Sequence, residues 1–300
     1  MQRILVSGAS GPIGTALISS FELQVERGEV ELVRLVRGRA KGAAQLSWDP
    51  FTPLSPAAVS GFDAVVHLAG ESVLGRWTAQ KKRAILDSRA QGTRNLAAGL
   101  AQSTTKPRVL VSASAVGFYG NRGDEILREE SPSGQGFLSD VCREWESACR
   151  VAADAGIRTV NVRIGLVLSD LGGALPSMLK PFKLGLGGRI GTGQQWLSWI
   201  HVDDIVGGIR HAMNTPELSG PVNLVAPNPV RNVEFTKVLA SVLKRPAFFP
   251  VPAFALRMAF GKMAANELFL FSQRVDPEKL RTTGYNYHYR DLTPALENLV

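Results

Sequence analysis

The stretch LVSGASGPIG, residues 5–14, places Gly8, Gly11 and Gly14 between a short apolar run and a segment with helical spacing of its apolar residues. A strand, a tight turn and a helix in this order can cradle a pyrophosphate, because glycines allow the turn, the close approach of the backbone and the packing of helix on strand. The helix N-terminus adds N–H donors and a positive dipole end. We therefore predict a dinucleotide-binding turn, with an incidental Gly-rich turn as the alternative. Its cofactor-binding residues would be Gly8, Ser10, Gly11, Pro12, Ile13 and Gly14.

Apolar strands alternate with helices over the first ~170 residues. Such alternation is typical of a parallel sheet that is covered on both faces. The fold class that follows is α/β, with a doubly wound parallel Rossmann sheet. Strands are predicted at residues 3–8, 30–37, 62–70, 108–115 and 158–168, with a last one near 221–226, and a long helix at about 77–101.

The composition changes beyond residue 170, where Gly and Pro become frequent and indicate loops with short elements. The chain then becomes helical, interrupted by the Pro-rich stretch RPAFFPVPAF at 245–254. We expect a dinucleotide-binding Rossmann domain over residues 1–228, with a substrate-loop insertion at about 170–200. A smaller, mainly helical C-terminal lobe would follow over residues 229–300.

The bulk composition is that of an ordinary soluble globule, with 45% of the 300 residues hydrophobic and 20% charged. No apolar run reaches the roughly 18 residues that could span a membrane, and a strand directly follows the first residue, where a signal peptide would stand. The net charge of +8 suggests an anionic ligand or a solvated basic surface, without a nucleic-acid-binding module. We expect a cytoplasmic protein whose partners include neither nucleic acid nor a membrane. Its oligomeric state is not indicated.

The two cysteines, Cys142 and Cys149, are seven residues apart in one predicted helix. Their Cα atoms would be about 10 Å apart, beyond the roughly 7 Å that a disulfide allows. Free thiols in a reducing compartment are therefore expected. The four histidines are scattered without metal-ligand spacing, so no metal site is predicted.

The end of the second strand indicates which dinucleotide binds. An NAD site uses Asp or Glu there for the ribose 2′-hydroxyl, whereas an NADP site uses Arg for the 2′-phosphate. This strand ends in Val36, Arg37, Gly38 and Arg39, with no acidic residue. Because Arg37 can hold a phosphate with two parallel hydrogen bonds, NADP is the predicted cofactor. A plain surface arginine is the alternative.

Four motifs occur together: Gly8–Gly14, His67–Gly70, Ser112–Gly120 and Trp199–Asp204. In combination they resemble the extended short-chain dehydrogenases of the epimerase/dehydratase branch. More narrowly, the chain is similar to the atypical epimerase family proteins sometimes described as nucleoside-diphosphate-sugar epimerases or cell-division-inhibitor-like. Residues 272–296 resemble the small domain that closes those proteins, so the resemblance covers essentially the whole chain.

This resemblance implies further cofactor contacts from later strands and from the long helix. Arg89 would face the cofactor, or else be a solvated helix arginine. Arg163 matches a cofactor-binding position of the relatives, or else is a structural ion-pair partner. The implied set is Leu68, Ala69 and Gly70 beside the adenosine ribose, Ser112 on the nicotinamide side, Arg89 and Arg163.

Working members of this family move a proton with Tyr-x-x-x-Lys, in which the lysine lowers the pKa of the tyrosine. The stretch FLSDVCREWE, residues 137–146, stands where that pair belongs. The candidate positions are Phe137 with Val141, or Leu138 with Cys142. Neither register offers a phenol or an amine.

Ser114 and Tyr119 remain as catalytic candidates. Ser114 matches the serine that orients substrate in the family, and Tyr119 matches a family tyrosine that is not the proton donor and more readily shapes the pocket or packs structurally. Cys142 is interpreted as a buried, small apolar residue, with a redox role as the alternative. His201 is interpreted as a structural hydrogen-bond partner, with catalysis as the alternative.

The loop before residue 200 carries amide and aromatic side chains that suit a flat or sugar-like ligand, although core packing explains the tryptophans equally well. Asp203 and Asp204 are predicted to cap a helix that begins near Ile205. The side chains in question are Gln195, Trp196 and Trp199.

The leading hypothesis is an NADP(H)-binding, epimerase-like oxidoreductase that lacks the usual dyad and acts on an unidentified small molecule, sugar-like or carbonyl. A catalytically silent NADP(H) sensor or interaction protein is the alternative. An active sugar-nucleotide epimerase is disfavoured, because the pair that moves the proton is absent.

Overall fold

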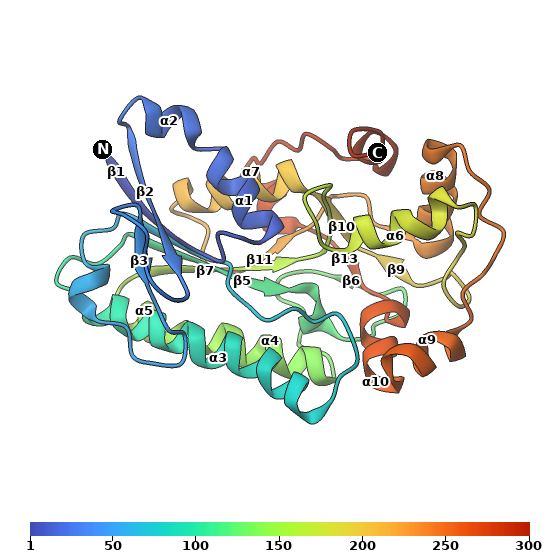
Figure 1. Ribbon diagram of the computed structural model, residues 1–300, viewed down its shortest axis with the longest axis horizontal. Helices are drawn as coiled ribbons and strands as arrows, with labels where there is room; N and C mark the ends of the chain where they lie inside the picture. Colours follow the sequence, from blue (N-terminus) through green and yellow to red (C-terminus); the bar gives the residue numbers. More distant parts are fainter.

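A seven-stranded, wholly parallel sheet forms the centre of the computed structural model, which describes all 300 residues (Figure 1). Its strand order is β11-β7-β5-β4-β1-β2-β3. The predicted doubly wound parallel sheet is confirmed, and the last predicted strand lies at its edge. The strands are β1 (Gln2–Ser7), β2 (Val30–Val36), β3 (Gln45–Ser47), β4 (Ala64–His67), β5 (Val109–Ala115), β7 (Arg158–Ile164) and β11 (Gly220–Leu224).

Helices cover both faces of this sheet (Figure 1). One face carries α3 (Ala79–Gln102), α4 (Phe137–Ala148) and α5 (Arg150–Asp154), and the other carries α1 (Pro12–Ser19) and α7 (Val202–Asn214). The peripheral elements are α2 (Glu22–Glu26) and the 3₁₀ turn η1 (Pro56–Val59). None of the helices combines the length and the hydrophobicity that crossing a bilayer requires.

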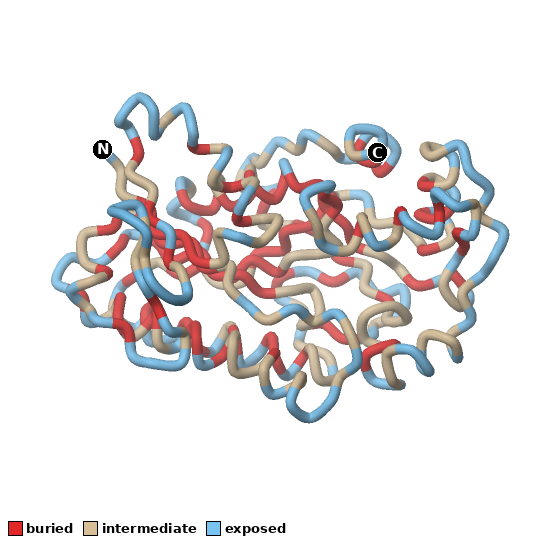
Figure 2. Tube along the Cα trace, viewed as in Figure 1, coloured by how far each residue is buried: buried red, intermediate tan, exposed pale blue.

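Alternate residues of the strands enter two different hydrophobic cores. Ile4 and Val6 of β1 belong to the core beneath α1 and α7, whereas Leu5 belongs to the core beneath α3. All three side chains are fully buried, and the sheet is the most continuously buried part of the chain (Figure 2). Burial on both faces explains why these strands are continuous apolar runs instead of alternating ones.

The chain changes direction across the sheet between β1 and β4. From β1, one set of strands extends through β2 to β3, and the other through β4, β5 and β7 to β11. Where strand order reverses, the loops after the neighbouring strands diverge and leave a crevice at their carboxyl ends. The Gly-rich turn follows β1 directly, so it lies at this crevice.

The second half of the chain adds a lobe with its own hydrophobic core, formed mainly by α6, α8 and α12. Its helices are α6 (Ala174–Lys183), α8 (Asn232–Leu243), α9 (Ala253–Phe260), α10 (Lys262–Ala265), the π-helical turn η3 (Asn266–Leu270), α11 (Glu278–Thr282) and α12 (Leu292–Glu297). Short elements complete the fold: η2 (Val116–Tyr119), β6 (Ile126–Leu127), β8 (Leu166–Leu168), β9 (Trp196–Leu197), β10 (Trp199–His201), β12 (Val230–Arg231) and β13 (Arg274–Val275).

The last part of the chain returns to the Rossmann sheet. Leu280 is fully buried in the core beneath α1 and α7, and β13 pairs in parallel with β6. The carboxylate of Asp204 on α7 accepts hydrogen bonds from the Tyr285 hydroxyl and from the backbone N–H groups of His288 and Tyr289. The C-terminal lobe is therefore fastened to the sheet as well as to its own core.

The start of α7 corrects one expectation. The helix begins at Val202, and the residue that caps it is His201, whose Nδ1 accepts a hydrogen bond from the Asp203 N–H at 3.1 Å. Asp204, which the sequence suggested as a cap, is fully buried because it holds the C-terminal segment instead. The structural interpretation of His201 agrees with this geometry.

Candidate active site

The Gly-rich turn is held against the loop after β4. Gly8 has a φ of +70°, and a Cβ at this position would lie 2.6 Å from the backbone carbon of Leu68 and 2.7 Å from the Ala69 nitrogen. A Cβ on Gly14 would overlap the Gly8 carbonyl oxygen. These contacts explain the glycines: one permits the left-handed turn, and both permit close packing.

The N-terminus of α1 is open toward this crevice. No side chain caps it, and Pro12 occupies its first turn, where an N–H would have no helical partner. Ser10 is exposed, while Gly11 and Ile13 are partly exposed. The predicted turn residues are thus brought together around an uncapped helix end, an arrangement that suits an anionic group.

The edge of the crevice near β2 carries a free cation. Arg37 follows β2, is exposed, and takes part in no ion pair. The next loop is fixed by a hydrogen bond of 2.6 Å that the Ser47 hydroxyl donates to the Gly38 carbonyl. No carboxylate stands at the strand end, so the site lacks the group that would hold an unmodified ribose 2′-hydroxyl.

Arg89 is held between α3, α4 and the loop after β4. Its Nη1 donates to the carbonyls of Glu71, at 2.8 Å, and Ile85, at 3.2 Å, and its guanidinium lies 4.8 Å from the centre of the Trp145 ring. A Cβ on Gly70 would lie 3.1 Å from the guanidinium carbon. Burial lowers the pKa of Arg89. Its Nε and Nη2 make no hydrogen bond within the protein, so these donors are available to a ligand beside Gly70.

Ser112 does not reach the crevice. Its side chain is fully buried, and its hydroxyl donates only a long hydrogen bond of 3.4 Å to the carbonyl of Ala113. Ser112 is paired in register with His67, which is also fully buried. The inferred cofactor contact of Ser112 is therefore not supported, because its side chain points into the protein interior.

Every guanidinium nitrogen of Arg163 donates a hydrogen bond to a partner within the protein. Its Nε and Nη2 donate to the two oxygens of Glu146 at 2.8 and 2.9 Å, and its Nη1 donates to the Tyr119 hydroxyl at 2.9 Å and to the Glu129 carbonyl at 3.0 Å. The side chain is 3% exposed and stacks on Phe118 at 3.5 Å. The structure thus favours the ion-pair alternative over the implied cofactor contact.

Tyr119 is fully buried, and its hydroxyl is fully engaged. The hydroxyl is 2.6 Å from the Asn223 Oδ1 and 3.0 Å from the Arg128 carbonyl, and it accepts a hydrogen bond from Arg163. Burial raises the pKa of Tyr119 to about 12. A phenol in this position supports the arginine and does not reach a substrate, so the geometry argues against Tyr119 as a catalytic group.

Ser114 donates its hydroxyl proton to Glu146. The Ser114 Oγ lies 2.7 Å from Oε1 of Glu146, the same oxygen that accepts from Arg163 Nε. Ser114 is 2% exposed and the Glu146 side chain 14% exposed. Oε2 of Glu146 accepts only one hydrogen bond, from Arg163, which leaves it able to accept a second. Ser114, Glu146 and Arg163 form a buried network at the carboxyl end of β5 and β7.

Sequence reasoning missed Glu146 as a site residue, although its spacing could have revealed it. Glu146 lies four residues beyond Cys142 and eight beyond Leu138, so all three share one face of α4. The Leu138 side chain packs near Gly117, and the Cys142 thiol lies 3.6 Å from the Ala115 carbonyl. Burial raises the pKa of the Cys142 thiol to about 11, which does not favour a redox role.

The start of α4 is capped from the C-terminal lobe. The two carboxylate oxygens of Glu267 accept the N–H groups of Phe137, at 3.0 Å, and Leu138, at 2.7 Å. Gly136, with a φ of +122°, leaves room for this carboxylate. The Phe137 ring meets Trp77 edge-on at 5.0 Å. Because α4 is fixed at both the lobe and the sheet, Glu146 has a defined position.

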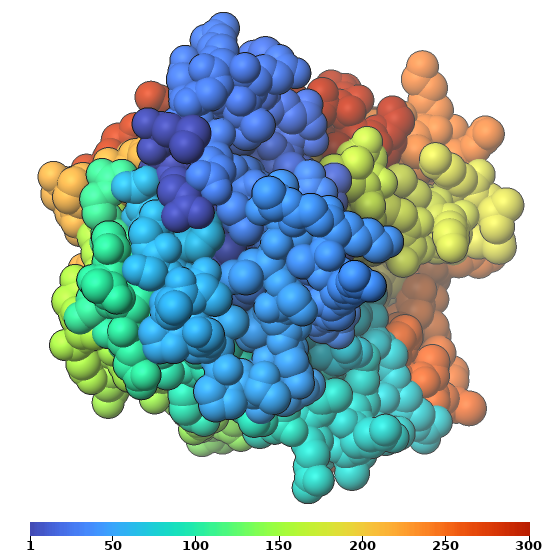
Figure 3. All heavy atoms as spheres, turned by 60° about the vertical axis from the view of Figure 1, so that its left-hand side comes forward, coloured from blue at the N-terminus to red at the C-terminus, as the bar shows by residue number.

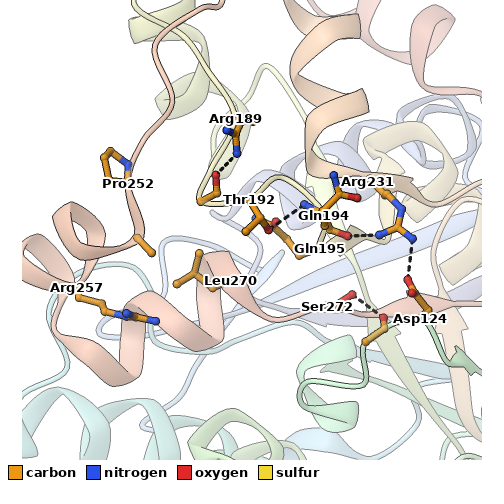
Figure 4. Close-up of a pocket in the computed structure, with 13 residues that line it drawn as sticks. Asp124, Arg189, Thr192, Gln194, Gln195, Arg231, Pro252, Arg257, Leu270 and Ser272 are labelled. Atoms are coloured by element: carbon orange, nitrogen blue, oxygen red, sulfur yellow. Dashed lines mark hydrogen bonds and ion pairs between the residues drawn. The ribbon is translucent and has the colours of Figure 1, made fainter.

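A polar pocket of about 670 Å³ lies between the 189–195 loop and the C-terminal lobe (Figure 4). Arg189, Arg231 and Arg257 line it, with Arg231 paired to Asp124 at 2.9 Å. The Trp196 ring beside it is contacted by Arg231, at 4.7 Å, and by Arg274. Its three arginines against one carboxylate suit an anionic ligand.

The two other side chains that the sequence suggested for a ligand, Gln195 and Trp199, have hydrogen-bond partners within the protein, although Gln195 also lines this pocket. Gln195 is buried and donates to the carbonyls of Ile190 and Phe269. Trp199 is fully buried in the core of the C-terminal lobe, and its Nε1 donates to the Asn228 carbonyl. No group of three His, Cys, Asp or Glu side chains could hold a metal ion, and both cysteines are free and buried.

The sheet, the crevice and the turn define the class of an NAD(P)-binding, epimerase-like Rossmann protein. The model of the NAD dependent epimerase/dehydratase family matches residues 4–225, and that of a domain of unknown function (DUF1731) matches residues 251–299. The chain therefore belongs to the NAD dependent epimerase/dehydratase family.

Relatives extend this likeness over the whole chain. The epimerase family protein Mb2239 of Mycobacterium bovis is 38% identical, over 98% of this chain and 96% of its own. YfhF of Bacillus subtilis is 43% identical over 79% of this chain and 78% of its own. The crystal structure of human epimerase family protein SDR39U1 with NADPH superposes with a TM-score of 0.89 at 36% identity, covering 99% of both chains.

Proposed function

We propose that the protein binds NADP(H) and acts as an oxidoreductase on a small carbonyl or sugar-like substrate. The human relative SDR39U1 was crystallised with NADPH, and here Arg37 replaces the carboxylate that an NAD site uses. The backbone from Gly8 to Gly14 would hold the pyrophosphate, and Arg37 the 2′-phosphate.

The chain's own residues fit this cofactor. The turn can pack closely on the loop after β4 only because Gly8 has no Cβ, α1 has no side-chain cap, and two donor groups of Arg89 have no partner in the protein. Leu68, Ala69 and Gly70 follow β4 beside that turn and range from partly buried to exposed. The uncapped helix end and the unpaired donors of Arg89 suit a dinucleotide lying across the crevice.

The observation that carries the proposed chemistry is the carboxylate of Glu146 on α4. When bound, NADPH supplies a hydride to the carbonyl carbon of a substrate; the carbonyl oxygen must then receive a proton. Glu146 is the ionisable group that α4 offers in place of Tyr-x-x-x-Lys, and its Oε2 can accept one more hydrogen bond. In the oxidation direction this carboxylate would accept the proton of a substrate hydroxyl; in the reduction direction it would first take a proton from solvent and then pass it to the carbonyl oxygen. Ser114 and Arg163 hold the carboxylate in place, so we assign them a positioning role.

A cofactor titration followed by a carbonyl panel tests this proposal. NADPH should bind in the micromolar range or tighter, and at least one carbonyl compound or sugar nucleotide should be reduced, with loss of absorbance at the nicotinamide band. Glu146→Gln should bind NADPH as the wild type does, with turnover reduced by about 10²–10⁴, the contribution typical of general acid–base groups. Unchanged turnover in Glu146→Gln would refute the assignment.

A second candidate function is a catalytically silent NADP(H) sensor. The specific observation in its favour is that Ser114 and Tyr119 are 2% and 0% exposed and both are committed to internal partners. Tight NADPH binding without reduction of any member of the panel would support this candidate and exclude the oxidoreductase.

The pocket with three arginines suggests which substrates to include. We propose that the substrate is a sugar-like or carbonyl compound with an anionic group, held by Arg189, Arg231 and Arg257. Phosphorylated and unphosphorylated versions of each panel compound should then differ in KM, with the anionic version at least tenfold lower. Equal KM values would contradict this assignment.

We also place the protein in the cytoplasm. Its two cysteines are free and buried, which suits a reducing compartment. A relative of Arabidopsis thaliana is named a chloroplastic homologue, so relatives are not confined to one compartment. Fractionation of the native host, with NADPH binding as the assay, would test this placement.

A further inference from the structure

The net charge of the protein is concentrated in one lobe. The segments 174–191 and 237–263 contain eight Lys or Arg residues and no Asp or Glu. Removing these eight from the 34 basic residues leaves 26, which equals the number of acidic residues in the chain. The rest of the molecule is therefore neutral, and the whole formal charge of +8 belongs to these two segments, which we call the basic lobe.

The basic lobe also exposes large apolar side chains. Phe248 is 82% exposed, Leu184 74%, Met258 73% and Phe254 65%. None of the eight residues of α9 is buried. Seven of the chain's 16 exposed large hydrophobic residues fall in these 45 positions; the remaining three are Leu186, Phe249 and Met263. Such clustering marks an interaction surface, because single exposed apolar residues are otherwise scattered.

The two segments of the basic lobe are adjacent in space. The Phe249 N–H donates to the Gly187 carbonyl, the Val251 N–H to Arg189, and the Gly191 N–H to Val251. The lobe lies at the end of the molecule opposite the N-terminus, where the 244–252 loop, the end of α6 and α9 gather (Figure 1), and its segments project beyond the rest of the surface (Figure 3).

We propose that the basic lobe docks the protein on an anionic lipid membrane. Lys and Arg residues attract the charged headgroups, and the projecting Phe, Leu and Met side chains enter the interface between headgroups and acyl chains. The sequence led us to expect no membrane partner because no segment is long and apolar enough to span a bilayer. Docking at the membrane surface does not require a spanning segment.

Charge and shape favour a membrane over a protein occupant. A second copy of the chain would bring two lobes of charge +8 together and repel itself. A folded protein partner needs roughly 800 Å² of continuous, complementary surface on each side. Here the apolar residues come from three segments, namely the loop after α6, the Pro-rich loop and α9, and a fluid interface can accommodate each exposed side chain individually.

Vesicle co-sedimentation with the full chain bound to NADPH tests the proposal. We expect at least tenfold stronger binding to vesicles of phosphatidylcholine mixed with phosphatidylserine than to phosphatidylcholine alone. Raising the salt to about 0.5 M should abolish the difference, because screening shortens the reach of surface charges. Equal binding to both vesicles, or binding to neither, would overturn the proposal.

Matched variants test whether vesicle binding depends on the basic lobe itself or only on the total charge and hydrophobicity of the protein. The triple variant Lys183→Gln, Arg245→Gln, Lys262→Gln should lose at least tenfold in binding to anionic vesicles. The control triple Arg76→Gln, Arg83→Gln, Arg94→Gln removes the same charge from exposed, unpaired positions elsewhere and should retain binding.

A matched pair of double variants tests the exposed apolar residues of the basic lobe. Phe248→Ser with Phe254→Ser should weaken binding, whereas Leu23→Ser with Phe51→Ser, exposed by 65% and 50%, should not. All variants should bind NADPH equally, which shows that they are folded. Equal losses in lobe and control variants, or a dimer in sedimentation that the lobe substitutions dissociate, would contradict membrane docking.

Discussion

Two buried polar networks support the two ends of the crevice, and they differ in charge. Beneath the Gly-rich turn, the Ser7 hydroxyl lies 2.6 Å from His67 Nδ1, and the Thr93 hydroxyl lies 2.9 Å from His67 Nε2. Beneath the α4 end, Ser114 and Arg163 both bind the carboxylate of Glu146. The first network is neutral and fully buried, whereas the second contains an ion pair with a partly exposed carboxylate.

This difference matches the tasks of the two ends. In the proposed cofactor complex, backbone N–H groups and Arg37 would bind the phosphates, so the network below the turn would need only to fix the turn. Moving a proton requires an ionisable group with access to the crevice, and a buried ion pair holds such a group rigidly at a cost in desolvation. Under the proposed function, the neutral end would therefore bind the cofactor, and the charged end would supply the group that moves a proton.

The largest effect should come from the turn itself. Gly8→Ala puts a Cβ within 2.7 Å of the β4 loop backbone at a positive φ, so we expect a loss of about 4 kcal/mol in stability and at least 100-fold in NADPH affinity. Gly28→Ala is the control, because Gly28 has a φ of +67° with no atom near its Cβ. It should cost about 1 kcal/mol and leave NADPH binding unchanged. Similar losses in both would mean that the packing against Leu68 is unimportant.

Breaking the charged network should come next. Glu146→Gln leaves the buried Arg163 without its carboxylate, and we expect a loss of about 3 kcal/mol in the free energy of unfolding. Glu31→Gln breaks the Arg3–Glu31 pair, whose side chains are 37% and 36% exposed, and should cost less than about 1 kcal/mol. Urea unfolding of both variants measures the contrast, and equal losses would contradict the distinction.

The stability that the neutral network around His67 contributes should decrease at acid pH. Burial lowers the pKa of His67 to about 4 from its ordinary 6.5, so between these values the unfolded chain binds a proton that the folded chain does not. The stability from neutral His67 is fully present above pH 6.5 and is lost as the pH falls through 4, by about 3 kcal/mol in all. His67→Gln should flatten this part of the stability–pH curve. An unchanged curve would show that His67 titrates normally.

The preference for NADPH over NADH should depend on Arg37, at the edge of the crevice near β2. Arg37→Ala removes a charge-assisted contact of about 1.5–3 kcal/mol, so the preference for NADPH over NADH should fall by tenfold or more. Arg34→Ala, at an exposed position of the same strand, serves as the control and should keep the preference. Affinities for both dinucleotides, measured by fluorescence titration, provide the ratio. A ratio that does not change in Arg37→Ala would contradict the NADP assignment.

The smallest effect should come from Tyr119→Phe. The hydroxyl joins Asn223 to Arg163, and its loss should cost about 1–2 kcal/mol in stability. Turnover should fall less than threefold, since the group does not face substrate. A large loss of turnover with stability intact would restore Tyr119 as a catalytic group.

The sequence predicted the fold and the Gly-rich turn, but it did not predict which polar side chains are buried in internal networks. The fold and the turn were readable because apolar runs and glycines are local requirements of a buried strand and a tight turn. Arg163, Ser112 and Tyr119, which the sequence suggested as site residues, are buried in the structure, and the sequence could not show this because burial depends on contacts with residues far away in the chain. Glu146 was overlooked for the same reason, although its helical spacing from Cys142 was visible.

The most direct test compares Ser114→Ala and Glu146→Gln with the wild type in NADPH affinity and in carbonyl reduction measured on the same samples. We expect NADPH affinity within twofold of wild type in both, turnover reduced by about 10²–10⁴ in Glu146→Gln, and a smaller reduction in Ser114→Ala, where Arg163 still holds the carboxylate. Full turnover in Glu146→Gln would contradict the assignment of proton transfer to α4, as would loss of NADPH binding in step with turnover.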